Sequence, residues 1–358
     1  MRLTLLGKFV ILALTLAALV AVWLILPVSW RRQPRPLRVV VHKTEVVEQH
    51  RGVILGYVAV PPLAVTDLTG TNPVPSEALK SSVAEVSLEA EANPAHALRK
   101  VASGVWDAVV VDFPTVVYAS RERNSGFRVI LPVSWREGAD RLMTRTDVSN
   151  WHQLKSTAYI PATSSEYVIR TLLQDLRLSP AHAEKVIMRM KPVETLAGSP
   201  EKHDAVAGRI DQIGRPPVGW SLRTVTDGVE QRRRMPDVLV VSDMFARNNP
   251  EGTVSLVRAF LNGSAAFAGL SPEKSVFVKE QAARMGISAK EAVRQMNPAP
   301  MEDVLSFMGV GVSRPGYADL VETQMSRTAS GGPKPLLETR VPVDNEPLIQ
   351  AREQAESL

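Results

Sequence analysis

Short apolar runs alternate with amphipathic stretches through the middle of the chain. Val109–Val111 is an apolar run that leads into Asp112, and Phe127–Val133 is a longer run of the same kind. Between them the pattern predicts a helix over Thr115–Glu122. Further strands are expected at Leu37–Val41, Val53–Val60, Val83–Leu88, Thr157–Ile160 and Asp237–Val241, and further helices at Pro94–Ser103 and from Pro250 onward. Strands that alternate with helices predict an α/β fold with largely parallel sheets.

One stretch after the strand at Thr157–Ile160 combines a turn with a helix start. Thr163 is followed three residues later by Glu166, which is the spacing of a capping box. Apolar residues then recur at helical spacing, at Val168, Leu172 and Leu176. A strand, a polar turn and a helix N-terminus together direct backbone N–H groups and a partial positive charge toward a bound anion. The alternative interpretation is an ordinary helix cap without a ligand.

The N-terminal segment is apolar enough to cross a membrane. Phe9–Val28 is 20 residues long and carries no charge, which matches the length of a membrane-spanning helix. No Ala-x-Ala-like cleavage site ends the run, so we interpret residues 1–30 as an uncleaved anchor, with a cleaved signal peptide as the alternative. Residues 31–36 are expected to be a stiff, exposed linker. By the positive-inside rule, the arginines of this linker would place the linker and the body of the protein in the cytoplasm. We nevertheless favour an exported body, on the resemblance described below.

Composition excludes several classes of protein. There is no cysteine, which rules out disulfides, thiol nucleophiles and cysteine metal sites. The sequence pI is about 9.5, but six of the 42 basic residues and none of the 37 acidic ones lie in residues 1–38. The rest of the chain is therefore close to neutral, and a nucleic-acid-binding surface is not expected.

Two segments of the chain repeat one pattern. Each has a predicted helix, then Gly-x-x-Asp at the turn into a predicted strand, and then a proline near the end of that strand; the two motifs are Gly104-Val-Trp-Asp107 and Gly208-Arg-Ile-Asp211. This repetition indicates two similarly built halves.

An ordered set of segments resembles the solute-binding proteins of ABC importers, in the branch that handles sulfonates, taurine, nitrate and pyrimidine precursors. The segments are Ala102–Ala108, Gly138–Asp140, Trp151–Lys155, Ala162–Ser165, Gly208–Asp211 and Asp237–Val241. The resemblance covers about residues 95–310. It implies a two-lobed periplasmic-binding-protein-like fold, in which each lobe is a mostly parallel sheet flanked by helices. The first lobe is expected at 37–145 and 246–325, the second at 146–245, and a polar tail at 326–358.

The same resemblance implies a ligand between the lobes, at the carboxyl ends of strands and the N-termini of helices. The expected ligand-binding residues are Thr44, Asp112, Ser134, Thr163, Ser164, Ser165 and Arg215. Thr163–Ser165 would supply hydroxyl and amide donors, and Ser134 would face them from the first lobe. Arg215 would be a charge-assisted clamp or, alternatively, part of a surface loop. Asp112 either meets the ligand or orders backbone amides. The proline-broken stretch 45–81 departs from the family pattern.

The sequence contains none of the common motifs of metal-dependent, phosphate-binding or serine-nucleophile enzymes. The six histidines are scattered, with no His-Glu-x-x-His motif, no phosphate-binding Gly-rich loop and no Gly-x-Ser-x-Gly elbow. We therefore expect no enzyme activity, no metal and no cofactor. The leading hypothesis is a solute-binding protein, anchored in a bacterial inner membrane with its body in the periplasm. It would capture a small polar or anionic molecule for an ABC permease. The alternative is a ligand-free scaffold or sensor module of an envelope complex with the same fold.

Overall fold

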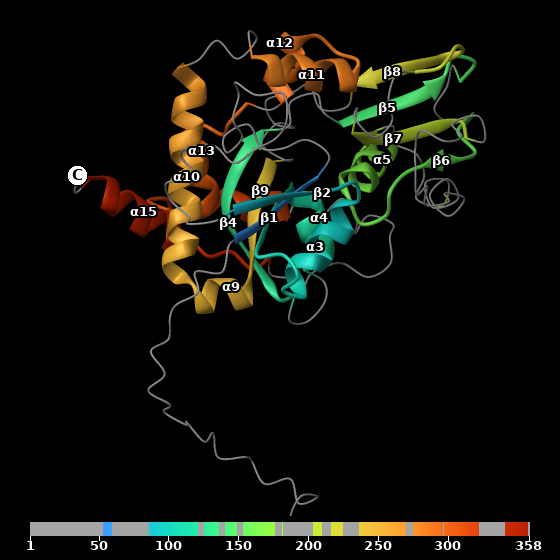
Figure 1. Ribbon diagram of the computed structural model, residues 1–358. Coiled ribbons are helices and arrows are strands. Elements are labelled where there is room, and N and C mark those ends of the chain that lie inside the picture. The colour runs from blue at the N-terminus through green and yellow to red at the C-terminus, as the bar shows by residue number, and fades with distance from the viewer. Residues whose placement is uncertain are drawn as a thin grey trace, which may run out of the picture. The chain divides into compact units, whose positions relative to one another are not determined.

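The computed structural model describes twelve parts of the chain, which form two β-sheets and the helices around them (Figure 1). They are residues 53–58, 86–120, 125–135, 140–148, 153–175, 181, 203–209, 216–224, 236–269, 275–295, 297–321 and 341–356. The predicted anchor at 1–30, the linker at 31–36 and the strand at Leu37–Val41 lie outside them. None of the helices within these parts is both long and apolar enough to span a bilayer.

The first sheet has five strands in the order β2-β1-β3-β9-β4. Their bounds are Val53–Val58 for β1, Val86–Glu91 for β2, Ala108–Asp112 for β3, Phe127–Trp135 for β4 and Pro236–Ser242 for β9. β1 runs parallel to β2 and β3, whereas β9 runs antiparallel to both β3 and β4. The expectation of a mostly parallel sheet therefore needs correction to a mixed sheet, because β9 returns from a distant part of the chain and enters between β3 and β4.

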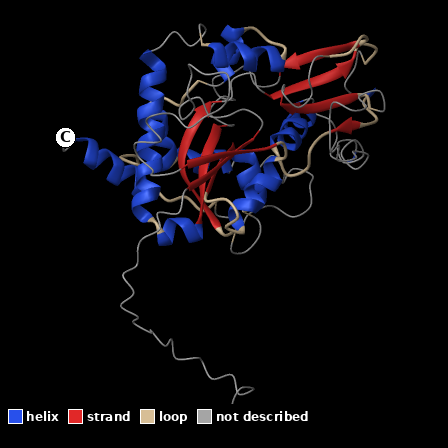
Figure 2. Ribbon diagram, in the orientation of Figure 1, coloured by secondary structure: helices blue, strands red, loops and turns tan. Residues whose placement is uncertain are grey.

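The second sheet has four strands in the order β6-β7-β5-β8 (Figure 2). Their bounds are Asp140–Arg145 for β5, Thr157–Ala158 for β6, Ala205–Arg209 for β7 and Trp220–Thr224 for β8. Only β6 and β7 pair in parallel, and β5 pairs antiparallel with both β7 and β8. This sheet is also mixed, not mostly parallel as predicted.

Strand pairing also moves the predicted boundaries between the two halves. β5 was expected in the first lobe, yet it pairs only with strands of the second sheet. β9 was expected in the second lobe, yet it lies inside the first sheet. The chain therefore leaves the first sheet before Asp140 and has returned to it by Pro236. An apolar run shows that a strand is buried, but it carries no information about which sheet the strand joins.

The helices begin where short polar residues cap them. Their bounds are Pro94–Ala102 for α3, Phe113–Ala119 for α4, Ser164–Asp175 for α5, Asp243–Asn248 for α9, Pro250–Gly269 for α10, Val276–Met285 for α11, Ala289–Gln295 for α12, Met301–Met308 for α13 and Glu346–Glu356 for α15. The Asn93 side chain accepts hydrogen bonds from the amides of Ala95 and His96, which satisfies donors that have no partner inside α3. α4 begins two residues before the predicted Thr115, because Asp112 caps it and Pro114 fits the first turn.

The apolar core of the described residues is divided. A large cluster surrounds the first sheet and includes the fully buried Trp106, Phe113, Phe127 and Phe260. A small cluster of Met143, Ala158 and Val206 belongs to the second sheet. A third cluster, on α10, α11 and α12, is built from Phe267, Phe277, Val278, Ala282 and Ala292. Separate clusters agree with a chain folded around more than one core.

Part of the predicted polar tail packs against the first sheet. Within 326–358 the structure describes residues 341–356, and Val343 forms a β-bridge with Val129 of β4. The Val129 amide donates to the Pro342 carbonyl at 2.8 Å, and the Asp344 amide donates to the Val129 carbonyl at 2.9 Å. α15 follows and contacts α10. Residues 341–356 are therefore held on the sheet, because apolar side chains such as Leu348 are buried against the main core.

Candidate functional site

Asp237 joins two of the predicted site residues at one edge of the first sheet. It is the second residue of β9 and pairs with Asp112 at the end of β3. On its other side it pairs with Ser134 near the end of β4. The Ser134 hydroxyl donates a hydrogen bond to Asp237 Oδ2 at 3.1 Å. Strand pairing thus brings Asp112 and Ser134 together through Asp237, which sequence analysis had treated only as the start of a strand.

Arg209 reaches this edge from the second sheet. It is the last residue of β7, and its Nη1 lies 4.0 Å from Asp237 Oδ1. The Arg209 and Asp237 side chains are only 11% and 14% exposed, respectively. Ion pairs in such partly buried places are screened less than surface pairs. We call Asp112, Ser134, Arg209 and Asp237 the edge cluster. Sequence analysis missed Arg209 as a site residue, although a cation at the end of an apolar strand was a usable signal.

Asp112 acts as a helix cap. Its Oδ1 accepts hydrogen bonds from the Thr115 amide at 2.9 Å and from the Thr115 hydroxyl at 2.7 Å. The side chain is almost completely buried. This matches the second of the two predicted roles, in which Asp112 orders the backbone at the start of α4. α4 in turn contacts α5, which belongs to the second sheet.

The turn before α5 is closed by the side chains that were expected to bind ligand. The Thr163 and Ser165 hydroxyls lie 2.7 Å and 3.0 Å from the Ile160 carbonyl and donate to it. Ser165 Oγ also accepts from the Ile160 amide at 2.8 Å. Glu166 Oε2 accepts from the Ala162 amide at 2.8 Å. The predicted capping box is therefore altered, since Glu166 reaches one residue further back than the cap residue Thr163.

Ser164 differs from its neighbours Thr163 and Ser165, whose hydroxyls both bond the Ile160 carbonyl. Ser164 is the first residue of α5 and is buried. The turn before it includes Ala162 at a φ of 57°, a left-handed conformation that non-glycine residues adopt uncommonly. β6 and β7 are parallel, so their carboxyl ends lie at one edge of the second sheet. The N-terminus of α5 and Arg209 therefore share that edge.

The remaining predicted residues are accounted for as follows. Thr44 and Arg215 lie outside the described residues. Trp135, which follows the predicted ligand contact Ser134, is buried and donates from Nε1 to Asp303 Oδ2 at 2.9 Å. In the parts of the chain that the structure describes, no group of three His, Asp or Glu side chains could hold a metal ion.

No family model matches the chain, and no curated protein sequence matches it. The solved structures that resemble it include three at 13–15% identity. A protein of Bordetella bronchiseptica has a TM-score of 0.58 over 86% of this chain and 99% of its own. The alkanesulfonate-binding protein SsuA of Xanthomonas axonopodis, bound to MOPS, has 0.53 over 82% and 98%. A periplasmic sulfonate-binding SsuA of Methylobacillus flagellatus has 0.54 over 86% and 95%.

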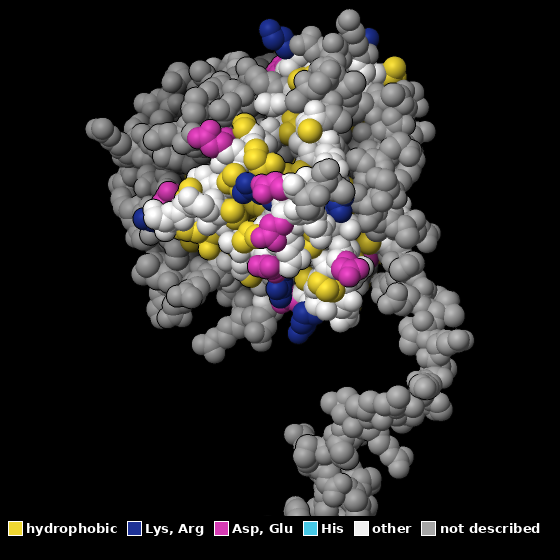
Figure 3. All heavy atoms as spheres, turned by 90° about the vertical axis from the view of Figure 1, so that its left-hand side faces the viewer, with side chains coloured by type: hydrophobic (Ala, Val, Ile, Leu, Met, Phe, Trp, Pro, Cys, Tyr) yellow, Lys and Arg dark blue, Asp and Glu magenta, His cyan; other side chains and the backbone are white. Residues whose placement is uncertain are grey.

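The fold is similar to that of periplasmic binding proteins. Within this periplasmic-binding-protein-like fold, the edge cluster lies at the carboxyl ends of β3, β4 and β7, where open α/β sheets generally bind ligands. Figure 3 shows the face of the molecule that carries α10 and α15. There the described acidic and basic side chains are interspersed with hydrophobic ones.

Proposed function

We propose that this protein is an extracytoplasmic solute-binding protein that captures a small polar or anionic molecule between two lobes. The observation that carries the proposal is Arg209 of the second sheet, a largely buried cation that lies 4.0 Å from Asp237 of the first sheet, the residue to which Ser134 also donates. A guanidinium forms charge-assisted, often bidentate, hydrogen bonds with oxyanions. The fold likeness to sulfonate-binding proteins supports the same class of ligand.

In this proposal each sheet with its helices is one lobe, and the ligand lies at the edge that they share. Ser134 acts from the first lobe, and Ser164 with the first amides of α5 acts from the second. Thr163, Ser165 and Asp112 shape the backbone around the ligand, since their side chains already bond within the chain. Thr44 and Arg215 remain proposed ligand contacts. Hinge motion in the two crossovers between the sheets would close the lobes over the ligand.

The proposal also includes the setting of the protein. Residues 1–30 would anchor it in a bacterial inner membrane, and the body would lie in the periplasm. The partner would be an ABC permease that receives the solute. The sequence contains no motif that combines a nucleophilic side chain with a general base. This supports binding of the solute without chemical change.

Thermal unfolding in the presence of candidate solutes tests this function. The panel contains alkanesulfonates, taurine, nitrate, phosphonates, pyrimidines and amino acids. A ligand present at a hundred times its Kd stabilises the folded state by about 2.7 kcal/mol, so one class should raise Tm by several degrees. Arg209→Met should abolish that rise. Arg352→Met is the matched control, because Arg352 is paired with Glu356 on the surface of α15 and should leave the rise unchanged.

A ligand-free scaffold or sensor module is the second candidate. The observation in its favour is that Thr163 and Ser165 are buried and bonded to Ile160. A flat thermal response across the whole panel, with Arg209→Met no different from the unsubstituted protein, would support the scaffold and contradict solute binding.

A further inference from the structure

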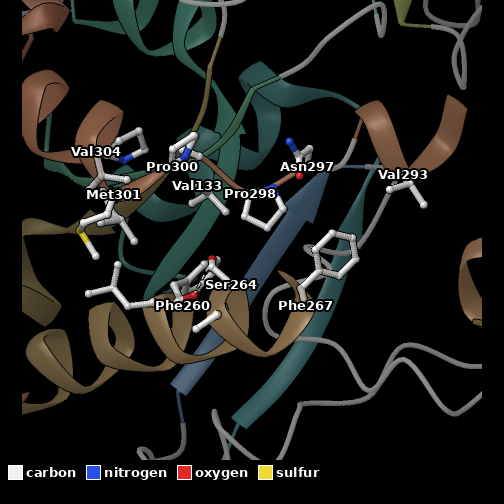
Figure 4. Close-up of a pocket in the computed structure, with 15 residues that line it drawn as sticks. Val133, Phe260, Ser264, Phe267, Val293, Asn297, Pro298, Pro300, Met301 and Val304 are labelled. Carbon is white, nitrogen blue, oxygen red and sulfur yellow. Dashed lines mark hydrogen bonds between the residues drawn. The ribbon is translucent and has the colours of Figure 1, made fainter. Parts of the chain in front are cut away.

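A concave site lies beside β4, away from the residues of the edge cluster, and is formed by α10 and the segment that follows α12. It is a pocket of about 510 Å³. In Figure 4, Phe260, Ser264 and Phe267 rise from α10 toward Val133, Asn297 and Pro298 on the opposite wall. This size falls in the range of about 300–1,000 Å³ typical of pockets for small molecules.

The described residues that line this pocket are uncharged and mostly apolar. Its lining residues include two phenylalanines, Phe260 and Phe267, which lie two helical turns apart on α10 and so on one face of it. Among the described lining residues, Ser264 and Asn297 supply the polar side chains and none is charged. Ser264 Oγ donates to the Phe260 carbonyl at 2.8 Å, so it can accept a hydrogen bond from a ligand, while the Asn297 amide can donate or accept one.

The pocket marks a gap between two apolar clusters. Phe260, Ala299 and Val304 belong to the main core. Phe267 belongs to the cluster on α10, α11 and α12, against which Val293 packs. Protein interiors are close-packed, with few voids larger than a water molecule. Apolar side chains of both clusters therefore face an open space of this size, and a bound molecule would cover them.

The far wall of the pocket is fixed by backbone hydrogen bonds. The Ala299 amide donates to the Val133 carbonyl at 2.9 Å, and the Trp135 amide donates to the Asn297 carbonyl at 3.3 Å. Pro298 forms a β-bridge with Ser134. Residues 297–299 thus lie along the outer side of β4 and pair with it through this isolated bridge. The pocket is built on a sheet edge and a 20-residue helix, which hold its shape without a ligand.

We propose that this pocket binds a neutral, mainly apolar small molecule, such as one with an aromatic ring system and one N–H or O–H group. The described walls favour a neutral ligand over an anion, because none of their side chains is charged and burial of a charge without a partner is strongly unfavourable. The pocket is therefore a different site from the edge cluster, and it does not depend on the proposed oxyanion-binding function. Burial of apolar surface between the two clusters supplies the affinity.

Fluorescence titration of the full chain with N-phenyl-1-naphthylamine tests the proposal. This probe is neutral, has two aromatic groups and one N–H, and brightens in apolar sites. We expect saturable binding of one probe per chain. Ala265→Trp places an indole at the pocket wall and should weaken binding by about tenfold or more. Asn262→Trp is the matched control, because Asn262 is exposed on the same helix and does not line the pocket.

Several outcomes would overturn this inference. Non-saturable binding, or equal affinity in Ala265→Trp and Asn262→Trp, would mean that the pocket is not the site. Loss of binding on Arg209→Met alone would place the probe at the edge cluster. Chain dimerisation that Ala265→Trp abolishes, without probe binding, would show that a second copy covers the pocket. Thermal unfolding of each variant shows that it is folded, and Met301→Trp at the mouth of the pocket provides a second filled variant if Ala265→Trp does not fold.

Discussion

The indole of Trp106 fills the space directly beside Gly56. A Cβ added to Gly56 on β1 would lie 2.1 Å from Trp106 Cε3. Trp106 itself is 1% exposed and donates from Nε1 to Glu89 Oε2 at 2.6 Å. Lys100 Nζ lies 4.2 Å from the centre of the ring, at a distance typical of a cation–π contact. Trp106 is therefore fixed from several sides and cannot retreat from a larger neighbour.

Gly56→Ala should lower the free energy of unfolding by about 1–3 kcal/mol, the usual effect of overpacking a core. Chemical denaturation monitored by tryptophan fluorescence measures it. Gly316→Ala is the control, since a Cβ at Gly316 would meet its nearest neighbour at an ordinary 3.4 Å. Equal stability of the two variants would contradict the close packing of β1 against Trp106.

Glu91 at the end of β2 should make stability fall in acid. Burial by itself raises the pKa of Glu91, but hydrogen bonds from Lys100 and the Asn93 amide outweigh it and hold the pKa below 4.5. Because the pKa is lower in the folded state, the stabilisation is present above pH 4.5 and is lost as pH falls below that value. Urea denaturation from pH 6 to pH 3 should show this loss, and Glu91→Gln should reduce the slope. Glu353→Gln on the exposed face of α15 is the comparison variant.

Variants of the turn before α5 separate its structural role from its proposed role in ligand binding. Thr163→Val removes the hydroxyl that bonds Ile160 and should reduce stability by about 1–2 kcal/mol. Ser164→Ala should leave Tm nearly unchanged, because alanine suits the first turn of a helix. The same substitution should lower the affinity for any ligand that the thermal-shift panel identifies. Differential scanning calorimetry measures the change in stability, and isothermal titration calorimetry measures the change in ligand affinity. If Ser164→Ala bound the ligand with unchanged affinity, Ser164 would have no part in the site.

Arg128 ties the C-terminal segment to the first sheet. Its guanidinium pairs with Asp243 at 2.9 Å and with Asp344 at 3.1 Å. Both carboxylates contribute to raising the pKa of Arg128 against the opposing effect of burial. Arg128→Met should cost about 1 kcal/mol, since the side chain is 30% exposed and solvent screens the pair.

Hydrogen–deuterium exchange shows where that loss falls. Residues 341–356 should exchange faster in Arg128→Met than in the unsubstituted protein, and β3 should not change. Arg352→Met, which removes a pair within α15 itself, serves as the comparison. Uniformly faster exchange along the whole chain would argue against a local role of Arg128.

Local elements were predictable because their signals lie in neighbouring residues. The apolar run at Val109–Val111 lies inside β3, and the predicted helix at Pro94–Ser103 matches α3 within one residue. β2 was less well placed. It ends at Glu91, three residues beyond the predicted Leu88, because a short alternating pattern does not fix where a strand ends; the first part of the predicted strand, 83–85, lies outside the described residues.

The sequence by itself determined an α/β chain with buried strands, a capped turn at Thr163 and polar residues at strand ends, because each depends on side chains close along the chain. Only the tertiary structure decided that β9 enters the first sheet and β5 the second. It alone brought Arg209 to Asp237 and turned the Thr163 and Ser165 hydroxyls inward to Ile160. Pairing between segments tens of residues apart follows from packing and backbone hydrogen bonding over the whole chain, and no local pattern encodes it.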